Sequence, residues 1–566
     1  MNARPSLQRL RPDVLLAIGL CAALLWAYPL ITLKLGQQGD IAVHLRWVEQ
    51  FYSALQDGVL LPRWAHAAQL GLGDPSFFYY QPLFYYVTSL FRWMGFGPER
   101  ALLLAGAMPT FAVAGIAYVQ FLKHYPARGA LAGTVFVACT PALFFMSTHL
   151  AGFPWTLSIP FSLLFAIESI RDKPRARYIA VLLCLICLSH LLSGMMTLLA
   201  TGLARLVFAA PKRHNLAANA AWLGGVVLGL ALAAFFLYPA LSQMHLINPA
   251  GWKDDFVAWE RCFALPVVTS IVFGIHWFGV QWVFASLCLG IILVVLLPRS
   301  QLPRTAGEVS ARRLGFVALC ALLLGTDLAY PLYALLPPME KLQFPYRFVF
   351  LASVLASVAL AIRLNEGAWK HWGKLTRGAV LLLILAHCGQ IAILQAKIAR
   401  DGLRMAAHEK YFSGRFGQPE YLLAVRGPLW KEYAAAGGLA HDCSRLEIAC
   451  SNIVKRSHSF KVDIDTPRAV TVRLPIFAFP AWEATVNGQP QSVVIDRDTG
   501  LVALQLAPGR HQIALRFGRL PVEIAGLWVS AIAALVLACL FVLGRYRLDP
   551  VRKASVAVNR APVATS

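Results

Sequence analysis

Long apolar runs constrain this sequence more than any other feature. The runs at 101–121, 129–148, 217–241 and 522–544 carry almost no charge. About twenty consecutive apolar residues in a helix cross the hydrocarbon core of a bilayer. Charged residues make up only 14% of the chain, whereas soluble domains carry about 25%. The sequence therefore predicts a polytopic α-helical membrane protein with about twelve membrane-spanning helices.

Basic residues are concentrated in the short loops between the apolar runs. Lys123–Arg128 and Arg171–Arg177 are two such loops, and three arginines precede the first run, Val14–Leu35. This clustering follows the positive-inside rule, so we expect both termini in the cytoplasm. The first run lacks a cleavage site and is predicted to be a retained anchor. Because the net charge of +23 lies in these loops, it does not indicate nucleic-acid binding.

The segment after the first run contains one ambiguous apolar stretch, Phe77–Phe96. It is long enough to cross the membrane, but its aromatic residues cluster on both sides of Pro82, as is typical of an interfacial segment. If it crossed, the next two basic loops would lie outside. We therefore expect residues 36–100 to form one external segment of short helices.

Residues 395–521 differ in kind from the apolar runs. From Phe460 onward, apolar and polar residues alternate as in strands, and turn signals occur at Asn487-Gly488 and Pro508-Gly509. This pattern predicts a small antiparallel β-sandwich outside the membrane. If this region is periplasmic, Cys443 and Cys450 are expected to form a disulfide. The predicted organisation is a transmembrane domain at 1–394, a periplasmic domain at 395–521, a last transmembrane helix at 522–544 and a cytoplasmic tail at 545–566.

Three residues at the start of the external segment have helical spacing. Asp40 and His44 are four residues apart and Trp47 follows three residues later, so a helix would place them on one face. The chain has no Walker loop, no GxGxxG after a strand, no HExxH and no GxSxG. An acid beside an imidazole is suited to catalysis. Spacing alone leaves a plain helix cap at Asp40, with a solvated His44, equally open.

Further polar residues are predicted on the outer side. A carrier phosphate that leaves during a reaction needs a cation, for which Arg347 and Lys341 are candidates. The alternative for Arg347 is interfacial snorkelling, and for His190 a hydrogen-bonded core position. A divalent metal at Asp40 stays open, although scattered ligands do not specify one. The candidate residues for substrate or phosphate binding are His149, His190, Glu340, Lys341, Gln343 and Arg347.

Several motifs resemble known membrane families. An outer Asp directly after the first span, followed by a long helical outer loop, resembles the GT-C glycosyltransferases, which take sugar from polyprenyl-phosphate carriers. STHLAGFPWTLSIP resembles their second outer loop, but near Phe153 and Pro154 it has no acidic residue, only His149. LGDPSFFYYQPLFYY, KLQFPYRF and FPAWEATVNGQP are more closely similar to bacterial YfhO-like and 6-pyruvoyl-tetrahydropterin synthase-related membrane proteins.

The resemblance implies a GT-C type glycosyltransferase of the bacterial inner membrane with its active site facing the periplasm. Its partners would be a polyprenyl-phosphate-linked sugar donor, a glycan, lipid or protein acceptor, and membrane lipid. Asp40 is expected to act as general base and His44 to orient it. Trp64, Tyr79 and Tyr80 are expected to stack on sugar or to line the carrier groove. Two other functions stay open, a lipid or polysaccharide transporter and a non-catalytic assembly factor of an envelope pathway.

Overall fold

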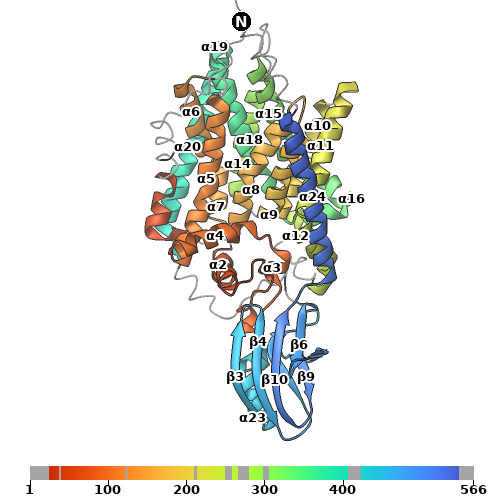
Figure 1. The fold of residues 1–566 in the computed structure, drawn as a ribbon. Coiled ribbons are helices and arrows are strands. Elements are labelled where there is room, and N and C mark those ends of the chain that lie inside the picture. Colours follow the sequence, from red (N-terminus) through yellow and green to blue (C-terminus); the bar gives the residue numbers. More distant parts are fainter. Residues whose placement is uncertain are drawn as a thin grey trace, which may run out of the picture.

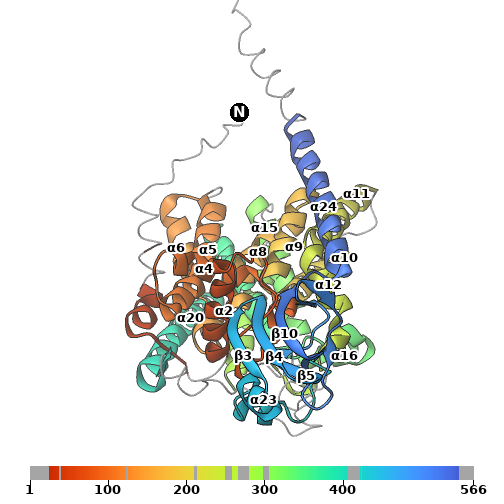
Figure 2. The ribbon, with the colours of Figure 1, turned by 60° about the horizontal axis from the view of Figure 1, so that its bottom comes forward.

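The computed structural model consists of a helical bundle with a β-sandwich at one end (Figure 1). Figure 2, which brings that end forward, shows the sheets in front of the bundle. Of the expected anchor at Val14–Leu35, the structure describes residues 19 and 24–35, of which 24–32 are helical, whereas the tail at 545–566 lies outside the described part of the chain beyond residue 546. The structure describes residues 19, 24–36, 40–122, 125–208, 213–248, 258–265, 279–297, 305–405, 421 and 423–546.

The bundle is a polytopic membrane domain. Among the described residues, five helices are long and apolar enough to cross a membrane, or up to seven if each of two bent pairs is one span. Three further apolar helices are shorter. The expected total of about twelve stays a prediction. The helices are α5 (Pro98–Leu122), α6 (Ala127–Ala138), α7 (Pro141–Thr148), α8 (Phe153–Ser169), α9 (Ala176–Ser189), α10 (Leu191–Phe208), α11 (Arg213–Leu232), α12 (Ala234–Ser242), α14 (Gly279–Leu296), α15 (Ala306–Leu324), α16 (Tyr330–Leu335), α17 (Pro337–Glu340), α18 (Arg347–Asn365), α19 (Ala368–His371), α20 (Lys374–Asp401) and α24 (Pro521–Tyr546).

The bend between α11 and α12 is stabilised by the last helix. The two helices meet at 74°, and a bend frees backbone groups that lipid cannot satisfy. Ser530 of α24 accepts a hydrogen bond from the Phe235 N–H at 2.8 Å and donates one to the Ala231 carbonyl at 3.1 Å. Gly526 lies against the backbone of Ala234, where a Cβ would approach the carbonyl oxygen to 2.6 Å. The small residue therefore allows α24 to reach the bend.

The segment that is expected to be external forms short helices between the bundle and the sandwich (Figure 1). They are α2 (Ile41–Gln56), α3 (Ser76–Tyr79) and α4 (Leu83–Trp93). The chain breaks at Pro82, which precedes α4, and α4 has only 11 residues. A helix of that length is too short to cross a bilayer. The stretch Phe77–Phe96 therefore does not form one spanning helix, in agreement with the expectation from the loop charges.

The C-terminal region contains two antiparallel sheets. One has the order β3-β4-β10-β6-β7 and the other β5-β9-β8. Cys443, in the short helix before β3, forms the expected disulfide with Cys450. The first strand begins at Ala449, earlier than the alternation from Phe460 indicated. The elements are α22 (Trp430–Ala435), α23 (Leu439–Leu446), β3 (Ala449–Arg456), β4 (Ser459–Thr466), β5 (Val470–Phe477), β6 (Trp482–Val486), β7 (Gln489–Gln491), β8 (Val494–Ile495), β9 (Leu501–Leu506) and β10 (Gly509–Phe517).

The sandwich packs against the external segment through aromatic rings and one ion pair. The Trp64 ring lies 5.5 Å from the rings of Trp482 and Phe517, and the side chain is only 1% exposed. This position corrects the predicted role of Trp64, because a ring enclosed by sandwich aromatics cannot stack on a sugar. The neighbouring Arg63 pairs with Glu523 at the start of α24. Both observations make this surface a fixed junction.

Two short strands connect the beginning and the end of the membrane domain. β1 (Lys34–Leu35) pairs in antiparallel fashion with β2 (Leu403–Arg404), which follows α20 directly. The Met405 N–H donates to the Leu33 carbonyl at 3.0 Å and extends the pairing. The pair lies just before α2 in the chain and therefore helps to place the first residues of the external segment.

Candidate active site

Asp40 lies immediately before α2, at the position of a helix cap. Its carbonyl accepts the His44 N–H at 2.9 Å, but its carboxylate makes no capping hydrogen bond. The residue is exposed to solvent. Protein nevertheless surrounds the carboxyl group, and this desolvation raises its pKa above the usual value, while the nearby Arg347 guanidinium opposes the shift. The group is therefore reachable from solvent on one side and free of a capping role.

Arg347 is the cation next to Asp40. It is the first residue of α18, and its guanidinium lies 4.5 Å above the Phe344 ring. Its Nε is buried and has no hydrogen-bond partner among the described residues. The preceding turn is held by the Tyr346 N–H, which donates to the Cys262 carbonyl at 2.9 Å. The Arg347 side chain also shares a hydrogen bond with the Tyr346 side chain, and its Nε keeps hydrogen-bonding capacity toward a ligand.

His44 lies deeper than Asp40 and is only 1% exposed. One ring nitrogen bonds to the Ala151 carbonyl, so this nitrogen carries the proton and Nδ1 accepts the Tyr85 hydroxyl at 2.8 Å. Burial lowers the pKa of His44 to about 3, so the ring is neutral at physiological pH. Both nitrogens are occupied. His44 therefore positions α2 and does not present a reacting atom.

His190 occupies the break between α9 and α10, as the sequence suggested. Its Nδ1 accepts the Ser193 N–H at 3.2 Å and lies 2.8 Å from the Ser193 hydroxyl. The ring lies within electrostatic range of both Arg347 and His44. The structure thus brings together Asp40, His44, His190 and Arg347, which belong to three regions far apart in the sequence.

Aromatic side chains surround this group of polar residues. Trp47 and Tyr80 are in edge contact at 4.7 Å, and Tyr421, from the segment before the sandwich, lies 6.1 Å from Trp47. Tyr79 stacks parallel to Tyr421 at 6.2 Å and donates its hydroxyl to the Gln243 carbonyl at 2.7 Å. Tyr80 and Tyr421 are half-buried, so each keeps part of its surface open.

Other predicted residues lie around the edge of this region. Glu340 and Lys341 are exposed in the turn before α18, and Gln343 is half-buried there with a left-handed φ of 54°. His149 is 4% exposed and stacks on Phe145 at 5.2 Å. Gly36 contacts the His149 backbone, so this imidazole packs between the bundle and the chain leading to Asp40. For Glu340, Lys341, Gln343 and His149, the predicted role in substrate or phosphate binding stays a prediction.

The described residues contain no group of three or more His, Cys, Asp or Glu side chains that could hold a metal ion.

Sequence reasoning missed two residues that the structure places here, Tyr85 and Tyr421. Tyr85 carries a local signal, since it follows Pro82 at the start of a helix in an aromatic-rich segment. Tyr421 carries none, because its contacts depend on tertiary structure.

Comparison with known proteins gives a family and a distant structural likeness. A family model described as a 6-pyruvoyl-tetrahydropterin synthase related domain, membrane protein, matches residues 77–398, more than half of the chain. The chain belongs to this family. The match to this PTPS-related family covers Arg347, His190, Tyr79, Tyr80 and Tyr85, but neither Asp40 nor Tyr421. No curated protein matches the chain.

Among solved structures, the arabinofuranosyltransferase AftD from Mycobacteria is similar over 69% of this chain and 27% of its own, with 15% identity and a TM-score of 0.40. A second AftD structure gives a TM-score of 0.41, with 15% identity over 69% of this chain and 28% of that one. The archaeal oligosaccharyltransferase AglB from Archaeoglobus fulgidus is similar over 70% of this chain and 55% of its own, with 14% identity and a TM-score of 0.35. This PTPS-related chain thus spans much less than two thirds of AftD.

Proposed function

We propose that this protein is a membrane glycosyltransferase of the inner membrane that uses a polyprenyl-phosphate-linked sugar on the periplasmic side. The observation that carries the proposal is the pairing of a desolvated carboxylate with a cation whose Nε lacks a partner, at the end of an apolar bundle. A transfer reaction of this kind needs a group that takes a proton and a cation that receives a phosphate leaving group.

Asp40 is proposed as the general base. The acceptor hydroxyl loses its proton to the carboxylate while its oxygen attacks the anomeric carbon of the donor. The bond from that carbon to the phosphate oxygen breaks, and polyprenyl phosphate leaves with the bonding electrons. A raised pKa supports this role, because a carboxylate with a higher proton affinity is a stronger base.

Arg347 is proposed to bind the phosphate of the donor. Its guanidinium is charged at every physiological pH and offers planar donors that match phosphate oxygens. Charge that develops on the leaving phosphate would be stabilised by a donor already in place. The half-buried rings of Tyr80 and Tyr421 are suited to contact the sugar. His44, neutral and fully bonded, is proposed to hold Asp40 in position through α2.

The experiment begins by identifying the lipid that copurifies with the protein by mass spectrometry. Purified protein is then incubated with that lipid-linked sugar and candidate acceptors, and release of polyprenyl phosphate is measured. Asp40→Asn is expected to abolish transfer without loss of folding. Glu49→Gln is the matched control, because Glu49 lies on the same helix but pairs with Arg92 away from Asp40.

Two outcomes would contradict the proposal in different ways. Full transfer activity in Asp40→Asn would exclude Asp40 as the base while leaving the enzyme class intact. Copurified carrier lipid that the wild-type protein holds but never converts, with any acceptor, would instead favour a non-catalytic role in envelope assembly.

A further inference from the structure

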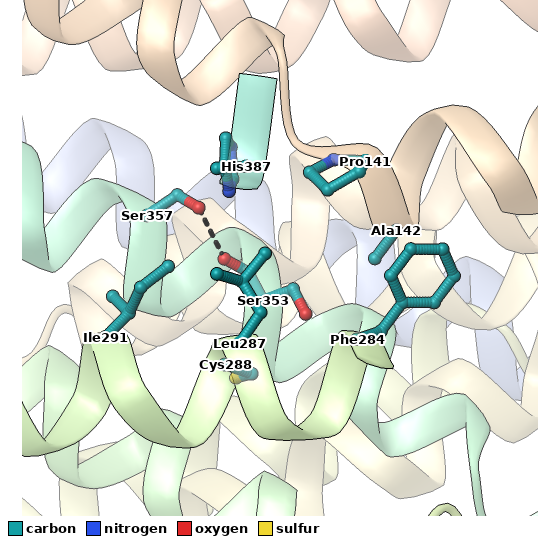
Figure 3. Close-up of a pocket in the computed structure, with 9 residues that line it drawn as sticks. All are labelled: Pro141, Ala142, Phe284, Leu287, Cys288, Ile291, Ser353, Ser357 and His387. Atoms are coloured by element: carbon teal, nitrogen blue, oxygen red, sulfur yellow. Dashed lines mark hydrogen bonds between the residues drawn. The ribbon is translucent and has the colours of Figure 1, made fainter. Parts of the chain in front are cut away.

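A small cavity lies inside the bundle, among helices α7, α14, α18 and α20 (Figure 3). Most of its lining is apolar, from Phe284, Leu287 and Ile291 of α14. Three polar side chains also line it, Ser353 and Ser357 of α18 and His387 of α20, and Figure 3 labels all three around the cavity. Polar groups enclosed in a membrane domain need hydrogen-bond partners, because lipid and apolar side chains supply none.

His387 presents an unsatisfied acceptor at this cavity. The side chain is 1% exposed, and its ring stacks on Phe136 at 4.4 Å. Its Nε2 lies 3.3 Å from the Phe136 carbonyl. Because a carbonyl only accepts, Nε2 must carry the ring proton and Nδ1 must be an acceptor. This Nδ1 is buried and has no donor within reach among the described residues.

Neither serine hydroxyl donates a hydrogen bond to His387 Nδ1, because each donates to a backbone carbonyl. The Ser357 hydroxyl donates to the Ser353 carbonyl at 2.8 Å, and the Ser353 hydroxyl donates to the Val349 carbonyl at 2.7 Å. The Ser353 oxygen is also hydrogen-bonded to the Cys288 thiol. Among the described residues, the Ser357 oxygen accepts from the Thr140 hydroxyl alone, at a long 3.4 Å, and so keeps a lone pair. The cavity therefore offers two acceptors and needs a small molecule with two protons to donate.

The size and lining of the cavity restrict that molecule further. About 10 Å³ is open to the centre of a water molecule, which is roughly the room that one ordered water needs. A metal cation would require several oxygen ligands, and the apolar lining would not replace the hydration that the cation loses on entry. A neutral molecule with two donor protons and this volume is water.

We propose that one buried water molecule bridges His387 Nδ1 and the Ser357 hydroxyl and so ties α20 to α18. This link matters for the position of α20, because α20 has few other contacts with the bundle. Only 22% of its 18-residue apolar segment is buried inside the protein. α20 leads directly into β2, and α18 begins at Arg347. The water thus fixes the position of α20 along its axis relative to α18, and these two helices place β2 and Arg347. The inference holds whether or not the protein is a glycosyltransferase.

A cryo-EM map of the wild-type protein in nanodiscs tests the site directly. At a resolution that shows other buried waters, we expect a density peak within hydrogen-bonding distance of both His387 Nδ1 and Ser357 Oγ. In His387→Phe, which keeps a ring on Phe136 but removes the acceptor, the peak should disappear. Absence of the peak in wild type, in a map that shows buried waters elsewhere, would overturn the proposal.

A double-mutant cycle measured by thermal unfolding tests the bridge. If one water serves both residues, His387→Phe and Ser357→Ala each remove it, and the double variant should lose less melting temperature than the sum of the single losses. Ser158→Ala is the control, because Ser158 is also buried and donates to a carbonyl of its own helix, but lies outside the cavity. Its effect should add to that of His387→Phe. Additive effects in both pairs would refute the bridge.

Discussion

The ion pair between Arg63 and Glu523 makes a quantitative prediction about the junction between sandwich and membrane domain. The two side chains are only 10% and 6% exposed. Arg63 also donates to the Gly518 carbonyl at 2.9 Å, and Glu523 accepts the Leu520 N–H at 2.7 Å. Glu523→Gln keeps one acceptor oxygen for the Leu520 N–H but places an amide NH2 where the other carboxylate oxygen accepted from Arg63, so the guanidinium loses its counter-ion and that acceptor.

The expected cost follows from the burial of the pair. Removing one partner of a buried ion pair costs about 3–5 kcal/mol, and the retained amide oxygen places this variant near the lower end. About 3 kcal/mol corresponds to roughly a hundredfold increase in opening of the junction, at about 1.4 kcal/mol for each factor of ten. The double variant Arg63→Met/Glu523→Gln removes both charges and should recover much of the loss.

Hydrogen exchange measured by mass spectrometry is the appropriate assay. Three backbone N–H groups are protected only while the sandwich is docked: Arg63 bonds to His458 at 3.2 Å, Ser457 to Asp57 at 2.9 Å, and Phe477 to Leu72 at 3.1 Å. Peptides that contain them should exchange faster in Glu523→Gln. Peptides from the ladder of β4 and β10 should not change, because those bonds lie within the sandwich. Unchanged exchange in Glu523→Gln, or a double variant as open as the single one, would refute the reasoning.

Three other predictions concern the candidate site. Because desolvation raises the pKa of Asp40, transfer activity should fall on acidification at a higher pH than for an ordinary aspartate of pKa 3.8, and a pH–rate profile that stays flat down to that value would contradict this. Arg347→Lys should keep the charge but lose planar donors, so KM for the lipid-linked donor should rise. Arg347→Gln should lower kcat/KM by about 10²-fold or more. Wild-type kinetics in both variants would exclude phosphate binding by this residue. Tyr85→Phe leaves His44 Nδ1 without a donor in a buried site, so the free energy of unfolding should fall by about 1–3 kcal/mol, measured as a lower melting temperature. Tyr86→Phe is the control and should have a smaller effect, because the Tyr86 hydroxyl donates to the Leu60 carbonyl at an exposed position.

Local patterns predicted much of this molecule. Apolar runs and basic loops indicated a polytopic membrane protein, and the alternation after Phe460 indicated the sandwich. The aromatic clusters around Pro82 correctly argued against a single span there. Each of these features depends on residues that are consecutive in the sequence, so hydrophobic periodicity and charge are enough to predict it.

Features that depend on distant contacts could not be predicted in the same way. Trp64 looked like a sugar-stacking ring because nothing near it in sequence shows that Phe517 and Trp482 enclose it. The bend at Ala233 depends on Ser530, and the protonation of His44 depends on Tyr85 and Ala151. For Asp40, the spacing to His44 left a helix cap and a catalytic acid equally open, and only the structure shows that the carboxylate does not cap α2.

The pairing of Lys34–Leu35 with Leu403–Arg404 also has a consequence for biogenesis. A ribosome delivers the chain from its N-terminus, so the strand beside Asp40 must wait for its partner until α20 has been synthesised. Contacts of such long sequence separation form late and slowly. The candidate site should therefore be among the last parts of the membrane domain to mature, and a chain that stops before β2 should insert helices without assembling it.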